Sequence, residues 1–357
     1  MEVVGLAANT SARKLAEQAN ELRPQAVCIA DESRADELRS HLAYSPQVFV
    51  GEAGLCEIAT LADAEMVLIA IIGTGGLRPA LAAIEAGKDL AVASKEILVM
   101  AGESVMGAAR KKAVRVLPVD SEHNAIFQAL GERPPESVAK IILTASGGPF
   151  REASLAEMRA ATPEQAVLHP VWSMGAKISV DSATMFNKGL EVIEAARLFP
   201  GPPIEVLIHP QSTVHGLVQY LDGSVLAQLG SPDMRTPIAH CLAWPRRMAV
   251  DVKPLDLAAL GRLDFAAPDD VRFPALRLCR AALATGGGAP CVLNAANEVA
   301  VALFLSRALG FLDIAAVVEE TLAALGDEGV PDLAAVFALD ASARQLAGRL
   351  AARRTAA

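Results

Sequence analysis

The segment MVLIAIIGTGGLRPALAAIEAGKDLAVASKEI, residues 66–97, decides the fold, because two short apolar runs in it enclose one stretch of helical composition. The runs at residues 66–72 and 89–94 carry almost no polar side chains, as is typical of strands that are buried on both faces. The Ala- and Leu-rich residues between them have the length of a helix. A strand, a helix and a second strand in this order predict a parallel sheet.

Similar apolar runs extend this pattern on both sides of the segment, at residues 3–8, 26–31 and 114–119. Segments of helical composition separate most of them. Residues 1–119 are therefore expected to form a doubly wound α/β domain.

The rest of the chain has a different pattern. In residues 120–245, Gly- and Pro-bearing loops interrupt the strands, and the turn Asp222-Gly223 joins VHGLVQYL to SVLAQLG in a long hairpin. We expect an α/β catalytic domain here. A stretch at about residues 245–274 carries Pro245, Pro254, Pro268 and Pro274, and residues 246–271 within it predict an extended linker. Residues 272–357 contain three candidate helices and predict a C-terminal helical domain.

Composition excludes several classes of function. The longest apolar run among the 357 residues, at residues 66–72, is far shorter than a membrane helix, so no membrane partner is expected. The N-terminus has no export signal, which favours the cytoplasm. A net charge of −9 argues against nucleic acid as a partner. The five cysteines form no C-x-x-C pair and are expected to be small core residues.

An acidic pair follows the apolar run at residues 114–119, in the stretch LPVDSEHN. In extended backbone, Asp120 and Glu122 would lie on the same side. They would also lie at the carboxyl end of a strand, where open α/β sheets bind ligands. Two hard oxygen donors suit Mg²⁺ or Mn²⁺ better than zinc. The alternative is a solvated strand end with an incidental acidic pair.

The stretch ISVDSATMFNKGLEVIEAARLF predicts a strand that ends near Val180 and a helix that begins near Ser182, with Asp181 or Ser182 as its N-cap. Asn187 and Glu191 are four residues apart and would share a helical face. Glu191 is a candidate third oxygen ligand. Ser182, Asn187 and the neighbouring Lys188 could bind a phosphate. The alternative is an ordinary amphipathic helix.

Two loops could contribute to the same site. LTASGGPF places Ser146 before two glycines, which allow close approach of a ligand to the backbone. HPVWSMG carries His169 and Trp172 and ends at Gly175, as a lid over a small polar substrate could. Trp172 could equally be a core residue and His169 a structural histidine. The cofactor signals, AIIGTGG and ASKEI, are weaker, and no G-x-G-x-x-G occurs near the start of the chain.

Taken together, five stretches resemble the 1-deoxy-D-xylulose 5-phosphate reductoisomerase family, and they occur in order along practically the whole chain. They are PVDSEHNAIFQ, ASGGPFRE, HPVWSMGAKISVDSATMFNKGLEVIEA, EVLIHPQSTVHGLVQYLDGSVLAQLGSPDMRTPIAHCLAWP and LNAANEVAVALFL. The resemblance implies isomerising reduction of 1-deoxy-D-xylulose 5-phosphate to 2-C-methyl-D-erythritol 4-phosphate, in the non-mevalonate isoprenoid pathway. It implies NADPH and a divalent cation as cofactors, the cation being magnesium or manganese, with cobalt as a third candidate. The implied partners are a small phosphorylated ketose and a second copy of the chain, paired through the hairpin sheet.

The family pattern also implies roles for matched residues. Those implied for catalysis are Lys95, Glu122 and His169, and those implied for the cation are Asp120, Glu122 and Glu191. Substrate binding is implied for Lys95, Ser121, Glu122, Ser146, His169, Ser182, Asn187, Lys188 and Glu191. NADPH binding is implied for Asn9, Thr10, Ser11, Ser94, Glu96 and Gly175, although Ser94 replaces the Asn or similar residue of other members.

Two other functions remain open at this point. The chain could be a related NAD(P)-dependent oxidoreductase that acts on another carbonyl, or a phosphosugar-binding remnant without a cofactor. An assay with NADPH and alternative carbonyls would distinguish the related oxidoreductase from a reductoisomerase. A cofactor titration would identify a remnant, which would not bind NADPH.

The resemblance finally leads to an expectation about Met1. In the family, the strand at residues 3–8 is the second one, after a first strand, a glycine-rich turn and a helix. That first strand would be central in a doubly wound sheet, and its turn would bind the pyrophosphate. We therefore expect the native chain to continue upstream of Met1.

Overall fold

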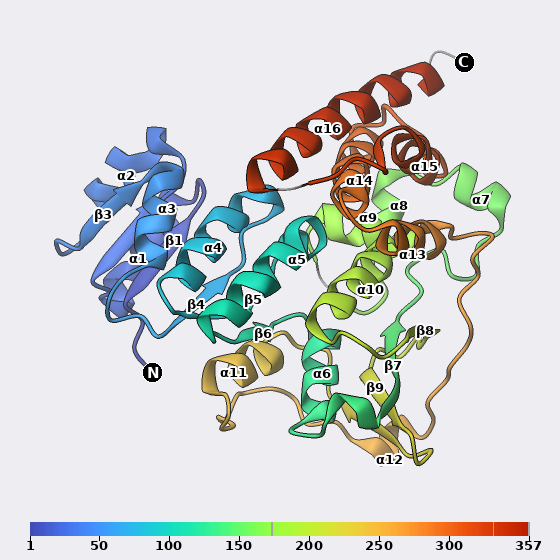
Figure 1. Ribbon diagram of the computed structural model, residues 1–357, viewed down its shortest axis with the longest axis horizontal. Coiled ribbons are helices and arrows are strands. Elements are labelled where there is room, and N and C mark those ends of the chain that lie inside the picture. Colours follow the sequence, from blue (N-terminus) through green and yellow to red (C-terminus); the bar gives the residue numbers. More distant parts are fainter. Residues whose placement is uncertain (173, 331, 356–357) are drawn as a thin grey trace. The chain divides into compact units, whose positions relative to one another are not determined.

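The structure is a computed structural model that describes residues 1–172, 174–330 and 332–355. The chain divides into two compact units. Unit 1 comprises Met1–Ile97 with Glu103–Leu117, and unit 2 comprises Leu98–Gly102 with Pro118–Ala357. Helices and strands alternate in unit 1, at the blue end of Figure 1, and helices dominate unit 2. The predicted α/β class is confirmed.

The strands of unit 1 form two sheets of three strands each, in the orders β1-β2-β3 and β4-β5-β6. Pairing is parallel between β1, β2 and β3 and between β4 and β5. Strand β3 was not expected from the sequence, whereas the other five were. Their bounds are β1 Gly5–Ala8, β2 Ala26–Ile29, β3 Gln47–Val50, β4 Met66–Ile69, β5 Asp89–Val92 and β6 Val116–Pro118.

Helices follow the strands of unit 1 as the alternation predicts. The buried side chains of helix α1, among them Leu15, pack with Val27 and Ile29 of β2 and with Leu38 of α2. The helices are α1 Ala12–Leu22, α2 Ala35–His41, α3 Gly51–Ala59, α4 Leu77–Glu85 and α5 Lys95–Lys112. The parallel arrangement places the carboxyl ends of β1, β4 and β5 before α1, the turn at Gly73–Gly76 and α5, respectively.

Unit 2 contains a four-stranded mixed sheet in the order β10-β9-β7-β8. Strands β9 and β10 form the predicted antiparallel hairpin, and Gly223 in its turn has a φ of 85°. The bounds are β7 Val138–Ala145, β8 Ile204–Ile208, β9 Val214–Tyr220 and β10 Val225–Leu229. Strand β10 lies at the edge of this sheet.

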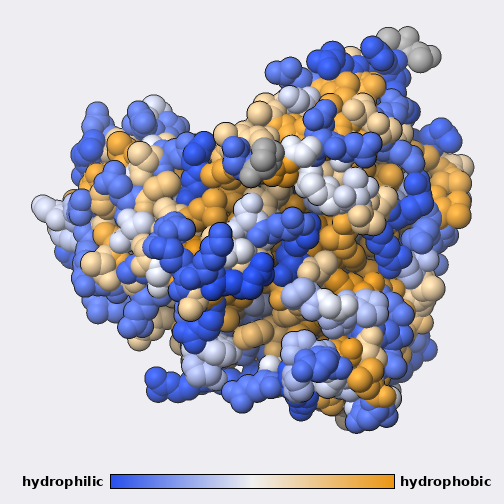
Figure 2. Space-filling model, viewed as in Figure 1, coloured by the Kyte–Doolittle hydropathy of each residue, from blue (hydrophilic) through white to orange (hydrophobic). Residues whose placement is uncertain are grey.

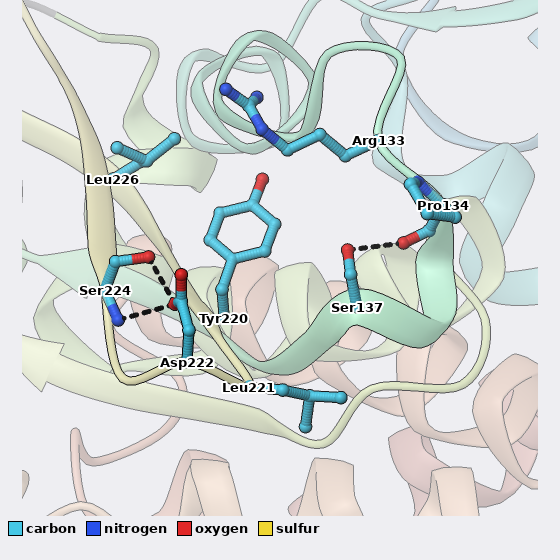
Figure 3. A pocket seen from close by; sticks show the side chains of 8 residues that line it. All are labelled: Arg133, Pro134, Ser137, Tyr220, Leu221, Asp222, Ser224 and Leu226. Carbon is cyan, nitrogen blue, oxygen red and sulfur yellow. Dashed lines mark hydrogen bonds between the residues drawn. The ribbon is translucent and has the colours of Figure 1, made fainter.

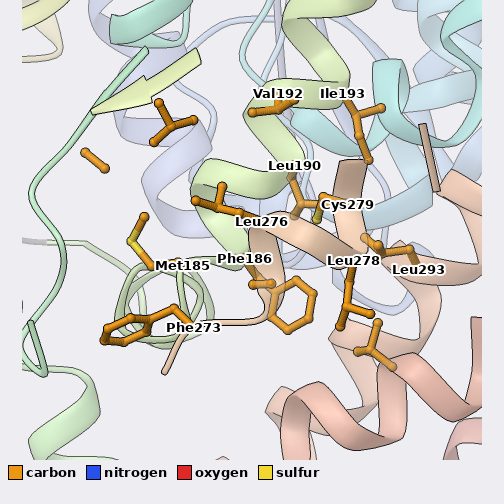
Figure 4. Close-up of a cluster of buried hydrophobic side chains, with 14 of the residues drawn as sticks. Met185, Phe186, Leu190, Val192, Ile193, Phe273, Leu276, Leu278, Cys279 and Leu293 are labelled. Atoms are coloured by element: carbon orange, nitrogen blue, oxygen red, sulfur yellow. The ribbon is translucent and has the colours of Figure 1, made fainter. Parts of the chain in front are cut away.

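Most helices of unit 2 contribute to one large apolar core, part of which is shown in Figure 4. Phe186 and Leu190 of α10 pack there with Leu276 and Cys279 of α13 and with Leu293 of α14. The helices are α6 Ser121–Leu130, α7 Leu155–Arg159, α8 Pro163–Ala166, α9 Ala176–Thr184, α10 Phe186–Leu198, α11 Arg235–Ala243, α12 Leu257–Leu260, α13 Ala275–Thr285, α14 Ala289–Leu305, α15 Asp313–Leu325 and α16 Leu333–Thr355. The three predicted C-terminal helices correspond to α14, α15 and α16.

Two expectations about local structure are wrong. The predicted strand near Val180 is helix α9, and the next helix, α10, begins at Phe186 after Met185, which has a left-handed φ of 66°. A short apolar run cannot distinguish a buried strand from a buried helix. The second error concerns Asp120 and Glu122, which do not lie on extended backbone. Strand β6 ends at Pro118, and Asp120 is the N-cap of α6.

The surface in Figure 2 intersperses hydrophilic with hydrophobic residues. Within the described part of the chain, no helix combines the length and the apolar character needed to cross a bilayer.

Candidate active site

The first element of the site is the start of helix α6. The Oδ1 atom of Asp120 accepts hydrogen bonds from the backbone N–H groups of Glu122 and His123, at 3.1 and 3.3 Å. These are N-cap bonds, which stabilise the first turn of a helix. Ser121 donates a short hydrogen bond to Oε2 of Glu122. The cap therefore fixes the orientation of one carboxylate and brings a second one beside it.

The second element is helix α10, most of which is buried. Asn187 donates to Oε1 of Glu191 at 2.6 Å, as the predicted spacing of four residues allows. The ammonium group of Lys188 lies 2.8 Å from Oε1 of Glu122 and forms a short contact with Oε2 of Glu191. Carboxylate oxygens of Asp120, Glu122 and Glu191 all lie within 4.8 Å of one another. The folding of unit 2 thus brings α6 and α10 together around an acidic cluster.

The carboxylates of this cluster stabilise the positive charge of Lys188. Lys188 is only 3% exposed, and burial alone would lower its pKa. The carboxylates of Glu122 and Glu191 outweigh that effect, so that the pKa of Lys188 is raised above its ordinary value. Lys188 is therefore an ammonium ion over the whole physiological range of pH.

The third element joins Ser146, in the loop after strand β7, to His169, in the segment between α8 and α9. His169 accepts hydrogen bonds at Nδ1 from the backbone N–H groups of Val171 and Trp172, at 3.2 and 2.8 Å. Its proton must then be on Nε2, which lies 2.9 Å from Oγ of Ser146 and donates to it. Gly148 also donates its N–H to this Oγ, at 3.1 Å. The hydroxyl of Ser146 is left to donate its own proton, for instance to a phosphate oxygen.

Two glycines let this loop approach helix α9. Gly147 and Gly148 have φ values of 84° and 69°, where other residues are strained. A Cβ atom on Gly148 would lie 2.7 Å from the carbonyl oxygen of Ser182. Only glycine therefore allows the loop of Ser146 to approach Ser182 so closely.

Burial also affects two histidines near the cluster. It lowers the pKa of His169, against a smaller opposing effect of Glu122. The pKa of His215, on strand β9, is lowered by burial in the same way. The ring of His215 lies 6.3 Å from that of Trp172, which belongs to the predicted lid. Ser173 of that lid lies outside the described residues, and Gly175 is the N-cap of α9.

The remaining candidates, apart from Gly175, belong to unit 1 and lie at the carboxyl ends of its strands. Asn9, Thr10 and Ser11 are exposed after β1, and Ser11 is the N-cap of α1. Ser94 is the N-cap of α5 and donates to the carbonyl oxygen of Ile71 at 2.6 Å, which ties the ends of β4 and β5 together. Lys95 and Glu96 form the first turn of α5.

Models of known families match most of the chain. The 1-deoxy-D-xylulose 5-phosphate reductoisomerase model matches residues 1–102, and its C-terminal domain model matches residues 116–199. A DXP reductoisomerase C-terminal domain model matches residues 229–346. The 1-deoxy-D-xylulose 5-phosphate reductoisomerase of Pseudomonas syringae is 55% identical over 339 residues, which cover 91% of this chain and 85% of that protein. The chain belongs to the 1-deoxy-D-xylulose 5-phosphate reductoisomerase family.

Solved structures of reductoisomerases agree with this assignment. The enzyme of Zymomonas mobilis in complex with NADPH has a TM-score of 0.93 and 50% identity, covering 98% of this chain and 92% of that one. A reductoisomerase in complex with NADPH, fosmidomycin and magnesium has a TM-score of 0.92 and 42% identity, covering 97% of this chain and 91% of that one. The family predicted from the sequence is confirmed, and the fold is that of known reductoisomerases.

Three residues near the acidic cluster were not predicted from the sequence. His215 carried no signal because it stands alone in a strand. His123 and Glu194 could have been found, since His123 follows Glu122 directly and Glu194 lies one helical turn after Glu191. Both are almost fully buried, and His123 contacts Asp120 as well as Glu194.

Proposed function

We propose that Asp120, Glu122 and Glu191 hold a divalent cation while the neighbouring residues bind the phosphorylated ketose. As a member of its family, the chain is an NADPH- and metal-dependent oxidoreductase that converts 1-deoxy-D-xylulose 5-phosphate for isoprenoid synthesis. The product expected from the family is 2-C-methyl-D-erythritol 4-phosphate. The observation that carries the proposed site is the acidic cluster between α6 and α10.

The donor chemistry of this cluster fits a hard divalent cation. Its three carboxylates supply hard oxygen donors within 4.8 Å of one another. Oxygen donors of this kind suit Mg²⁺ and Mn²⁺. When bound, the cation would polarise the substrate carbonyl and stabilise negative charge on its oxygens. We propose that manganese serves as well as magnesium.

The phosphate would lie near the loop of Ser146. The hydroxyl of Ser146 is oriented by His169 and Gly148, so that it can donate outward. The close approach of Gly148 to Ser182 brings a second hydroxyl-bearing residue beside it. Asn187 and Lys188, at the start of α10, would add an amide and an ammonium group. In the structure these two contact Glu191, so they would link the phosphate site to the cation site.

The family resemblance supports the catalytic roles proposed for Glu122, His169 and Lys95. Glu122 would hold the cation and orient Ser121. Neutral His169, with its proton on Nε2, would donate to a substrate oxygen through Ser146 or directly. Lys95 would supply a positive charge at the start of α5. NADPH would bind at the carboxyl ends of the unit 1 strands, near Asn9 and Glu96, and would supply the hydride.

The decisive experiment is substrate-dependent oxidation of NADPH, measured with and without Mg²⁺ or Mn²⁺. We expect oxidation only with the phosphorylated ketose and a divalent cation. Oxidation of NADPH with other carbonyls but not with this ketose would favour a related oxidoreductase. Binding of ketose and Mn²⁺ without binding of NADPH would favour the remnant without a cofactor.

We also propose that two copies of the chain associate through the hairpin of β9 and β10. Strand β10 is a sheet edge, and Leu221, Val225 and Leu226 are 72%, 47% and 38% exposed. Beside them lies a cavity of about 550 Å³, which Figure 3 shows between Arg133, Tyr220 and Leu226. An exposed apolar edge strand of this kind can pair with the edge of a second sheet.

Sedimentation equilibrium would test this association. We expect a dimer for the unmodified chain and a monomer for Leu226→Lys. Leu155→Lys is the matched control, because Leu155 is 46% exposed but lies on α7. A dimer that survives Leu226→Lys would place the interface elsewhere.

We also propose that the protein is cytoplasmic and that each segment of the chain has its own function. Five free cysteines, four of them buried, suit the reducing cytoplasm. Residues 1–119 would bind the dinucleotide, and residues 120–245 would carry the cation, the substrate and the dimer contact. Residues 246–271 are irregular apart from α12 and a bridge to β8, and would connect to the helices of residues 272–357.

A further inference from the structure

The imidazole of His123 lies behind the cation site, where it joins two carboxylates. Its Nδ1 atom is 3.3 Å from Oδ1 of Asp120 and 3.2 Å from Oε2 of Glu194. Its Nε2 atom is 2.9 Å from the backbone carbonyl oxygen of Glu191. The side chains of His123 and Glu194 are 0% and 1% exposed, so water does not weaken these contacts.

The geometry fixes one proton of the imidazole. A carbonyl oxygen can only accept, so Nε2 carries a hydrogen and donates it to Glu191. The Nδ1 atom faces two carboxylate oxygens. Contacts of 3.2 and 3.3 Å at this atom therefore link Glu194 through His123 to Asp120.

The connection reaches both sides of the cation site. The Oδ1 atom of Asp120 accepts the N-cap bonds and also contacts the imidazole. The backbone of Glu191 is held through its carbonyl group. His123 thus contacts two of the three proposed ligand residues, although it does not itself belong to the proposed ligand set.

We propose that Glu194 is a positioning residue, which acts through His123 to hold Asp120 and the backbone of Glu191 in the arrangement that binds the cation. The inference rests on the proposed cation site at Asp120, Glu122 and Glu191. Outer groups of this kind, which orient the ligands of a metal, typically change its affinity about 10- to 100-fold. Glu194 therefore sets the affinity for the cation without touching the substrate.

Binding of Mn²⁺ to the full-length chain, followed by electron paramagnetic resonance without substrate or NADPH, tests this role. We expect Glu194→Gln to weaken Mn²⁺ binding about 10- to 100-fold while the stoichiometry stays at one ion per chain. Raising the Mn²⁺ concentration should then restore turnover, because the reacting groups are intact. Glu194→Asp, which keeps the charge but shortens the side chain, should have an intermediate effect and serves if Glu194→Gln does not fold.

A double-mutant cycle tests whether Glu194 acts through His123. In a His123→Gln background, Glu194→Gln should have little further effect on Mn²⁺ affinity, because the connection is already broken. Glu298→Gln is the matched control, since Glu298 is another mostly buried carboxylate of unit 2, paired with Arg344. It should leave Mn²⁺ affinity within about twofold of the unmodified chain.

Three outcomes would overturn the proposal. Unchanged Mn²⁺ affinity in both Glu194 variants would show that the connection is only structural, and additive effects in the cycle would show that Glu194 does not act through His123. Two ions per chain, one of them lost in Glu194→Gln, would make Asp120, His123 and Glu194 a cation site of their own. Glu191→Gln separates these results from failure of the proposed site itself. If it binds Mn²⁺ normally, the site is wrong, and if it does not, only the role of Glu194 is in question.

Discussion

The ammonium group of Lys188 lies 2.8 Å from Oε1 of Glu122, in the interior of unit 2. The sequence predicted Lys188 as a phosphate ligand, but the structure shows that it also compensates two carboxylates. One residue therefore connects the charge of the proposed cation site with that of the proposed phosphate site.

Lys188→Ala should raise the KM for the phosphorylated ketose strongly. Loss of a charge-assisted hydrogen bond to the phosphate corresponds to about 1.5–3 kcal/mol. The measurement is steady-state kinetics at saturating Mg²⁺. Lys140→Ala is the matched control, because Lys140 pairs with Glu205 at the same distance of 2.8 Å but outside the site. A KM equal to that of the control would remove Lys188 from the phosphate site.

Glu191→Gln should lower metal-dependent turnover by several orders of magnitude and leave the fold intact. The amide keeps the shape and can still contact Asn187, but it no longer offers a negative oxygen to a cation. Turnover, Mn²⁺ affinity and circular dichroism should be measured together. Glu205→Gln, at a side chain that is 51% exposed, is the control. Normal Mn²⁺ affinity in Glu191→Gln would disprove the proposed ligand set.

Gly148→Ala should damage the phosphate site more than its backbone strain alone explains. The new Cβ atom would meet the carbonyl oxygen of Ser182 at 2.7 Å, so that the loop of Ser146 must move. Gly201→Ala is the matched control, because Gly201 also has a positive φ, 114°, but has open space at its Cβ position. We expect a KM at least tenfold above that of the control, or about 1.4 kcal/mol. Equal kinetics in the two variants would show that the contact is not required.

The conformational stability should decrease in acid partly because of His169. Burial holds its pKa below the ordinary value of about 6.5, so the neutral form is favoured in the folded state. This contribution is fully present above about pH 6.5 and is lost as the pH falls through the lowered pKa. Urea unfolding at several pH values should show a smaller decrease in His169→Gln than in the unmodified chain. An identical pH dependence would mean that other groups, such as His215, account for the effect.

The fluorescence of Trp172 should respond to a substrate analogue bound with a divalent cation. Its ring lies 6.3 Å from that of His215, next to the site. The measurement needs a Trp244→Phe background, because Trp244 is the other tryptophan of the chain. A constant emission from Trp172 in that background would make it an ordinary packing residue and would argue against a lid at this position.

Much of the fold could be predicted because hydrophobic burial leaves a periodic pattern. The apolar runs that became β2 and β5 are buried on both faces, and the pair Asn187 and Glu191 shows the spacing of a helix. The stretch before Ser182 could not be assigned in this way. Its apolar run is as short as that of a strand. Only the structure shows that this stretch is a helix, in which Lys177 pairs with Asp181 one turn later.

The site was harder to predict than the fold because its contacts join distant parts of the chain. The acidic residues of α6 and α10 could be recognised as candidates separately. Their mutual approach depends on the packing of unit 2. The contact of Lys188 with two carboxylates depends on the same packing. His123 and Glu194 lie next to predicted residues, but without the structure nothing indicates that they contact each other.

Hydrogen exchange at the N-cap of α6 should depend on the position of the Asp120 carboxylate. The amide hydrogens of Glu122 and His123 are donated to Oδ1 of Asp120, and such hydrogens exchange with solvent only when the bond opens. Any event that pulls Asp120 toward or away from the helix should therefore change the exchange rates of these two amides. Their exchange rates would report on Asp120 without an attached probe and without turnover, at the point where a helix begins and a cation is expected to bind.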